Sequence, residues 1–102
     1  MINCTYDREN CRMSIFGHAG YAPKGADIVC AGVTALEIAL EHHFYTRDGC
    51  YVRIEPSSAI FVGTEETRDV MDCIWGGLTA IGENYENWVV CARGGVDNPL
   101  QI

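Results

Sequence analysis

The chain has 102 residues, of which 48% are hydrophobic and 21% are charged, and these values are ordinary for one soluble globular domain with a modest core. Fourteen acidic residues against seven basic ones give a formal net charge of −7, which argues against nucleic acid as a partner because nucleic-acid binders present a basic face. The acidity favours a basic peptide or protein partner through long-range attraction.

Residues 1–10 do not contain a basic segment followed by an apolar run, and no apolar run in the chain approaches about 18 residues. We therefore expect a cytoplasmic protein with no membrane partner. The six cysteines form no CxxC pair and no Cys/His spacing typical of zinc, so we expect no metal and no cofactor. Five of the cysteines are predicted to be reduced packing residues, with Cys30 as the exception.

Alternation of apolar and polar residues predicts a β-hairpin at the start of the chain, with a turn at residues 7–10. Its inward positions are Ile2, Cys4, Tyr6, Cys11, Met13 and Ile15. A second hairpin is predicted from strand-like runs at residues 50–55 and 59–62, which are separated by the turn Pro56-Ser57-Ser58. A last strand is predicted from Trp88 to Ala92.

Two amphipathic helices are predicted between these strands. The first runs from Ile28 to about Phe44, and its apolar stripe is Val29, Val33, Leu36, Leu40 and Phe44. The second begins after Gly63 with Thr64 as its cap, ends near residue 84, and has the buried line Val70, Ile74, Leu78, Ile81 and Tyr85. Gly76, Gly77 and Gly82 inside this helix predict close packing against a neighbour.

The order ββαββαβ predicts an α+β fold, with a mostly antiparallel sheet of about five strands and both helices on one face. We expect a single domain over residues 1–92. Residues 93–102 contain glycine and proline and are expected to form a flexible tail.

The stretch from Gly17 to Leu36, GHAGYAPKGADIVCAGVTAL, combines a histidine, a glycine-containing loop and a cysteine at the start of a helix. Asp27 occupies the position of an N-cap, whose side chain accepts hydrogen bonds from the first helical turn. Cys30 then falls at the third helical position, where the partial positive charge of the helix end favours a thiolate. Together with His18, it forms a minimal pair for acyl transfer. Backbone N–H groups of this turn, including that of Cys30, are the expected oxyanion donors.

Spacing alone leaves alternatives open for each of these residues. Cys30 could be a small buried hydrophobe and His18 an ordinary loop histidine. Asp27 either orients the histidine or only caps the helix. Thr34 either bonds near the sulfur or bonds back to the carbonyl of Cys30. Tyr21 either contacts a bound peptide or covers the loop.

The order of residues resembles the signature of the ribosomal-processing cysteine protease family of bacteria. In chain order the matching segments are Gly17-His18-Ala19, Gly25-Ala26-Asp27-Ile28-Val29-Cys30-Ala31 and Val33-Thr34-Ala35-Leu36. Residues 78–85 and 88–90 also resemble the C-terminal half of that family, so the resemblance covers nearly the whole chain.

This resemblance implies that His18 and Cys30 are catalytic. From their positions, Asp27 and Thr34 are the residues expected to support them. The residues expected to bind substrate are Gly17, Tyr21 and Gly25. The implied activity is that of a cysteine endopeptidase, which removes the N-terminal extension of a large-subunit ribosomal protein by cutting after a Phe-Phe-like site. A homodimer is implied, and a phage capsid or scaffold protein is an alternative substrate.

Two other functions remain open at this point. The chain could be a non-catalytic domain, ribosome-associated or regulatory, in which Cys30 and His18 only pack. Alternatively, it could be a thiol-redox protein that uses Cys30.

Overall fold

The computed structural model describes residues 1–93 of the chain. The elements in order are β1 (Ile2–Asp7), β2 (Arg12–Gly17), α1 (Ile28–Tyr45), β3 (Tyr51–Glu55), β4 (Ser58–Val62), the 3-10 turn η1 (Glu65–Thr67), α2 (Arg68–Asn84) and β5 (Val89–Arg93). The predicted order ββαββαβ is confirmed. The expected flexible tail lies outside the described residues, apart from Arg93, which ends β5. The domain boundary at residue 92 stays a prediction.

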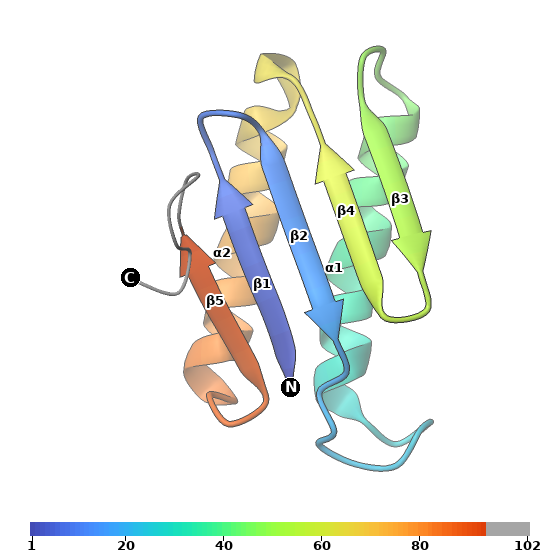
Figure 1. Cartoon of the computed structure of the whole chain (residues 1–102), viewed down its shortest axis with the longest axis vertical. Coiled ribbons are helices and arrows are strands. Elements are labelled where there is room, and N and C mark those ends of the chain that lie inside the picture. Colours follow the sequence, from blue (N-terminus) through green and yellow to red (C-terminus); the bar gives the residue numbers. More distant parts are fainter. Residues whose placement is uncertain (94–102) are drawn as a thin grey trace.

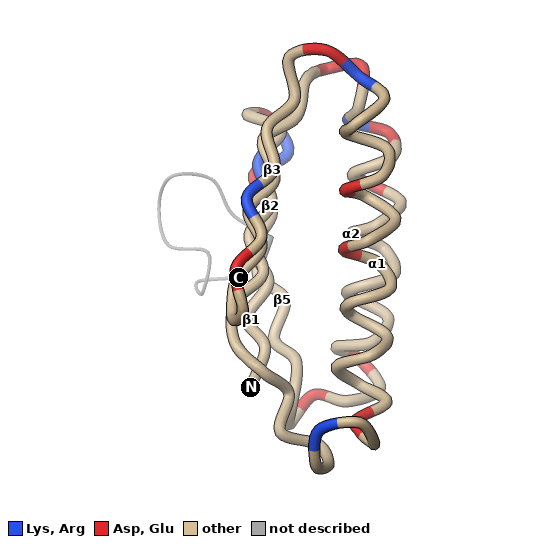
Figure 2. Tube along the Cα trace, turned by 90° about the vertical axis from the view of Figure 1, so that its right-hand side faces the viewer, with Lys and Arg blue, Asp and Glu red and all other residues tan. Residues whose placement is uncertain are grey.

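The five strands form one sheet in the order β3-β4-β2-β1-β5. Three neighbouring pairs are antiparallel, and β1 and β5 are parallel. Strands β1 and β4 run in the same direction, since each is antiparallel to β2. Helix α2 follows β4 and carries the chain back, so β5 starts at the same end of the sheet as β4 and β1. Both helices lie behind the sheet (Figure 1), and the edge-on view shows sheet and helices as two layers (Figure 2). The predicted α+β class is therefore confirmed.

The core fills the space between these two layers. Alternating strand residues point into it, and the inward positions predicted for the first hairpin are all buried: Ile2, Cys4, Tyr6, Cys11, Met13 and Ile15. Of these, Cys11 lies in the turn before β2, with a positive φ of 54°, and not in the strand. The predicted stripe of α1 is buried at Val29, Val33, Leu40 and Phe44. Leu36 is half-buried against the core.

The second helix differs from its prediction in start and in buried face. It begins at Arg68 because residues 65–67 form a 3-10 turn, so Thr64 precedes that turn and does not cap α2. Its buried residues are Met71, Ile74, Trp75 and Leu78. The predicted members Val70, Ile81 and Tyr85 are only partly buried. The stripe is centred closer to Met71 and Trp75, and the ring of Trp75 packs against Tyr6 of β1 with centroids 5.5 Å apart.

The glycines of α2 do not share one role. A Cβ built on Gly77 would lie 3.0 Å from Cδ1 of Leu36, so close packing between α1 and α2 is confirmed there. Gly76, the preceding residue, has open space around that position, and the prediction is wrong for it. A Cβ on Gly82 would meet the Val89 carbonyl oxygen at an ordinary 3.5 Å.

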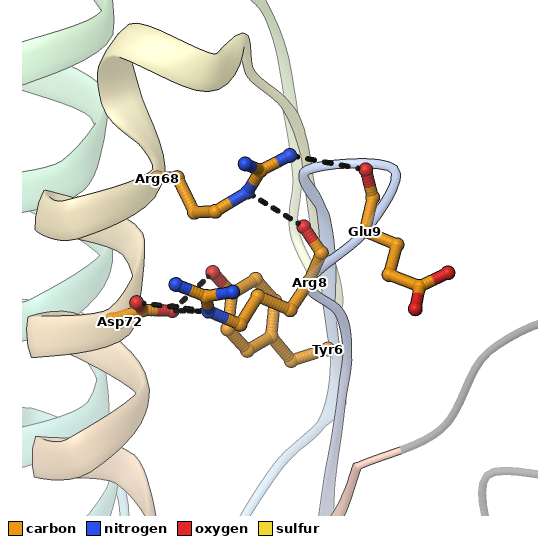
Figure 3. A network of polar contacts seen from close by, with 5 residues as sticks. All are labelled: Tyr6, Arg8, Glu9, Arg68 and Asp72. Carbon is orange, nitrogen blue, oxygen red and sulfur yellow. Dashed lines mark hydrogen bonds and ion pairs between the residues drawn. The ribbon is translucent and has the colours of Figure 1, made fainter.

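A polar network fastens the β1–β2 turn to the start of α2 (Figure 3). The buried Tyr6 hydroxyl donates to Oδ1 of Asp72 at 2.7 Å, and Nε of Arg8 pairs with the same carboxylate at 3.0 Å. Arg68 donates to the carbonyl oxygens of Arg8 and Glu9 at 3.1 and 3.2 Å. Because the partners come from separate segments, the network fixes the hairpin against the helix layer.

All six cysteines are free thiols. Cys4 and Cys11 are buried, and Cys50 and Cys91 are half-buried. Cys73 is exposed on α2, so the prediction that five cysteines pack is wrong at that position. Neither of the two helices within residues 1–93 has the length and apolar character needed to cross a membrane.

Candidate active site

The loop from residue 18 to residue 27 joins β2 to α1 and carries His18. Its first hinge is Gly17, whose φ is +96°, a value that L side chains rarely adopt. A Cβ at this position would also collide with the carbonyl oxygen of Met1. The N–H of Gly17 donates to the carbonyl oxygen of Ser57 at 2.9 Å, which ties the loop to the β3–β4 turn. Gly17 therefore has a structural role, and its predicted contact with substrate stays a prediction.

The other end of the loop is held by Asp27, the N-cap of α1. One carboxylate oxygen accepts from the N–H of Cys30 at 2.9 Å, and the other accepts from the N–H of Tyr21 at 3.0 Å and of Ala22 at 3.5 Å. These backbone bonds, led by that of Cys30, lower the pKa of Asp27. Within the described residues no hydrogen bond links Asp27 to His18. The capping interpretation is therefore confirmed, and the orienting one is not.

This cap also changes the expectation for the oxyanion. The N–H of Cys30 already donates to Asp27, so it is not free to bind an oxyanion in this conformation. The N–H of Ala31 is used as well, in the first helical bond to the Asp27 carbonyl. This conformation does not support Cys30 as an oxyanion donor, and that role stays a prediction.

An aromatic cluster holds the middle of the loop. The ring of Tyr21 lies edge-to-face against Trp88, with centroids 4.9 Å apart, and against Tyr85, with centroids 5.6 Å apart. Tyr21 does not line the cleft beside the loop. Of its two predicted roles the structure supports covering and anchoring the loop, and it does not support contact with a bound peptide.

A cleft of about 1040 Å³ opens beside the loop. Its floor includes Ile2 and Ile15 from the inner face of the sheet and Val33 from α1. The turn between β3 and β4 and the glycine loop form its walls, and Gly25, which has a φ of +92°, is part of the loop wall. The volume is at the upper end of the range for ligand sites, and the apolar floor suits hydrophobic side chains.

The predicted pair faces this cleft. His18 and Cys30 both line it, His18 as an exposed side chain and Cys30 as a half-buried one. No hydrogen bond joins the two residues in the described part of the chain, so direct proton transfer requires the imidazole and the sulfur to come closer together. Thr34, one helical turn after Cys30, also lines the cleft. Its hydroxyl makes no bond back to the Cys30 carbonyl in the described structure, so that alternative is not supported.

Two further parts of the cleft were missed from sequence. Pro56, Ser57 and Ser58 were predicted only as a turn, yet they line the cleft together with residues of α1. Glu37 lines the cleft from within the apolar stripe of α1, where its charge is unusual. The spacing in the sequence could have identified Glu37. It follows Cys30 by seven residues, which is nearly two full helical turns, so both lie on the same side of α1. Among residues 1–93, no group of three His, Cys, Asp or Glu side chains is placed to hold a metal ion.

An α+β domain in which a histidine and a helix-start cysteine face one apolar-floored cleft has the site of a thiol-dependent hydrolase. The sequence matches the family described as cysteine protease Prp over residues 1–90. The chain therefore belongs to the Prp family of cysteine proteases. No protein with a curated description matches the sequence significantly.

Solved structures agree with the fold. The S. aureus protein described as an essential ribosomal processing protease Prp, in complex with a covalently linked product peptide, is 18% identical. The match covers 91% of this chain and 97% of that one, with a TM-score of 0.74. The same S. aureus protease with a substrate peptide matches with a TM-score of 0.71, 16% identity and the same coverage. SMU.848 from Streptococcus mutans is 23% identical, with 93% and 95% coverage and a TM-score of 0.71.

Proposed function

We propose that this cysteine protease removes the N-terminal extension of a large-subunit ribosomal protein by cutting after a Phe-Phe-like site. The observation that carries the proposal is the match to the cysteine protease Prp family over residues 1–90. The related S. aureus protein is described as a ribosomal processing protease and has been solved with a product peptide covalently linked to it. The apolar floor of the cleft supports an aromatic preference, because Ile2, Ile15 and Val33 offer hydrophobic contact.

In the proposed reaction the sulfur of Cys30 attacks the carbonyl carbon of the scissile bond. His18 takes the thiol proton and delivers it to the leaving amine, so the C–N bond breaks and a thioester remains. His18 then takes a proton from water as the hydroxide adds to the thioester carbon. The C–S bond breaks, the acid product is released, and His18 gives that proton to the sulfur. Closure of the loop that carries His18 brings the imidazole to the sulfur when a peptide fills the cleft.

The test is incubation with a peptide that contains the Phe-Phe site, followed by mass spectrometry. The wild type is expected to give one cut after the aromatic pair, while Cys30→Ser and His18→Ala abolish or nearly abolish it. A matched peptide that carries the corresponding site of a phage capsid or scaffold protein examines the alternative substrate. Full activity in either variant would remove the proposed pair from the mechanism.

Thiol labelling separates catalysis from packing. Cys73 is exposed outside the cleft and serves as an internal control, whereas Cys30 is only half-buried. If Cys30 reacts with iodoacetamide faster than Cys73 near neutral pH, accessibility does not explain the difference and activation of the sulfur does. A slower Cys30 would favour a non-catalytic domain. Rapid labelling without any peptide cleavage would favour thiol-redox chemistry.

The proposal includes a homodimer that acts in the cytoplasm. Phe16 and Tyr51 are exposed at 43% and 54%, so they offer apolar surface that a second copy could cover. Light scattering after size-exclusion chromatography measures the mass in solution. A monomer at all concentrations would contradict the homodimer and leave the cleavage chemistry intact.

A further inference from the structure

The cleft contains a carboxylate that the proposed reaction does not use. Glu37 lines it from α1, seven residues after Cys30. With a rise of about 1.5 Å per residue, its Cα lies roughly 10 Å further along the helix than that of Cys30. Nearly two full turns separate the two residues, so their side chains leave the helix on the same side.

The other acidic residues on the cleft are already engaged. Asp27 accepts three backbone hydrogen bonds at the helix start. Glu55 pairs with Nε of Arg53 at 3.1 Å. In contrast, no hydrogen bond or ion pair of the described residues uses the carboxylate of Glu37, although its side chain is half-buried.

The surroundings of Glu37 disfavour its negative charge. Burial, with a contribution from Glu41 one turn away, raises the pKa of its carboxyl group. One helical turn before it, the buried Val33 lines the same cleft and offers the carboxylate no polar partner. Free protein therefore keeps a poorly solvated acid group next to the substrate site, and a cation brought by a ligand would relieve this cost.

The position of Glu37 defines which part of a peptide could supply that cation. An extended peptide advances about 3.3 Å per residue, so a distance of roughly 10 Å corresponds to about three residues. The cleft follows α1 over this distance, since residues from Asp27 to Ile38 line it. Based on the proposed peptidase function, we propose that Glu37 forms a subsite for a lysine or arginine side chain about three residues from the cleaved bond.

The test is a set of Phe-Phe peptides, each with a single lysine at one of the three positions on either side of the cut. A matched set has norleucine in place of lysine, which keeps the length of the side chain and removes its charge. The enzymes compared are the wild type, Glu37→Gln and Glu41→Gln. Glu41 is a suitable control because it is the next acidic residue on α1 and does not line the cleft.

For the wild type, kcat/KM is expected to be roughly ten- to a hundredfold higher for lysine than for norleucine at one position, the range for a hydrogen bond to a charged group. Glu37→Gln should bring that ratio close to one by lowering kcat/KM for the lysine peptide. Glu41→Gln should keep the preference. Glu37→Asp, which retains the charge, should keep part of it.

The outcomes distinguish this inference from the function on which it rests. If the wild type cuts none of the peptides, the proposed function fails. If it cuts them without a preference for lysine, or if Glu37→Gln keeps that preference, the subsite is wrong and the peptidase assignment stands. An equal loss on lysine and norleucine peptides would assign Glu37 a structural role and would also overturn the subsite.

Discussion

The most informative change outside the cleft is Tyr21→Ala, because it separates loop anchoring from chemistry. Tyr21 is 39% exposed, and its ring makes two edge-to-face contacts, with Trp88 and Tyr85. Such contacts contribute about 0.5–1.5 kcal/mol each beyond area burial, so the variant should weaken docking of the loop by about 1–3 kcal/mol. That range corresponds to a decrease of roughly 5- to 150-fold in the ratio of docked to open loop.

Hydrogen exchange followed by mass spectrometry measures this ratio directly on a peptide that spans residues 18–27. The N–H groups of Tyr21 and Ala26 are both bonded, to Asp27 and to the Pro23 carbonyl, and should report opening of the loop. Tyr21→Ala should increase exchange there and leave the centre of the sheet unchanged. Because His18 is on this loop, kcat/KM for a Phe-Phe peptide should fall in parallel.

Tyr21→Phe is the matched control. The tyrosine hydroxyl has no hydrogen bond in the described residues, so the phenylalanine ring should keep both contacts and the wild-type behaviour. Unchanged exchange of residues 18–27 in Tyr21→Ala would refute the anchoring role. Faster exchange in the core of the sheet would show that the ring supports the whole domain and not the loop.

The remaining predictions concern stability, measured as the urea midpoint. Gly76→Ala should stabilise the protein by about 0.5–1 kcal/mol because the position is open and helical. Gly77→Ala should stabilise it less, or destabilise it, because the added methyl group meets Leu36. Equal effects of the two substitutions would contradict close packing of Gly77 against Leu36. Tyr6→Phe should cost about 1.5–3 kcal/mol, since it removes a bond to a charged carboxylate, and no change would mean that the bond to Asp72 adds nothing. Glu37→Gln should be more stable than the wild type near pH 7, with a difference that shrinks toward pH 4. Folding raises the pKa of the Glu37 carboxyl group above its ordinary value of 4.5. The protonated group therefore favours the folded state below pH 4.5, and this contribution to stability is lost as pH rises and the group ionises. A stability difference between Glu37→Gln and the wild type that does not change with pH would contradict this prediction.

Features set by near neighbours in the chain were predictable from the sequence. The cap at Asp27, the position of Cys30 in the first turn and the two hairpins all depend on residues a few positions apart. The apolar stripe of α1 followed from its periodicity for the same reason. These local signals also fixed the α+β class, and the residue order around His18 and Cys30 pointed to the family.

Features set by distant partners were not predictable. The sequence left two roles open for Tyr21 because its partners Trp88 and Tyr85 lie far along the chain. Gly76 and Gly77 look the same in sequence, and only the position of Leu36 on another helix distinguishes them. Glu37 was overlooked because its role depends on which side of α1 the cleft occupies.

The missing side chain at Gly17 has a practical consequence for handling the protein. It leaves room for the Met1 carbonyl oxygen beside the loop, and Ile2 forms part of the cleft floor, so the N-terminus lies close to the site (Figure 1). An affinity tag fused ahead of Met1 would emerge beside Gly17, at the edge of the cleft, and would compete with a peptide for it. Activity measurements should therefore use protein from which such a tag has been completely removed.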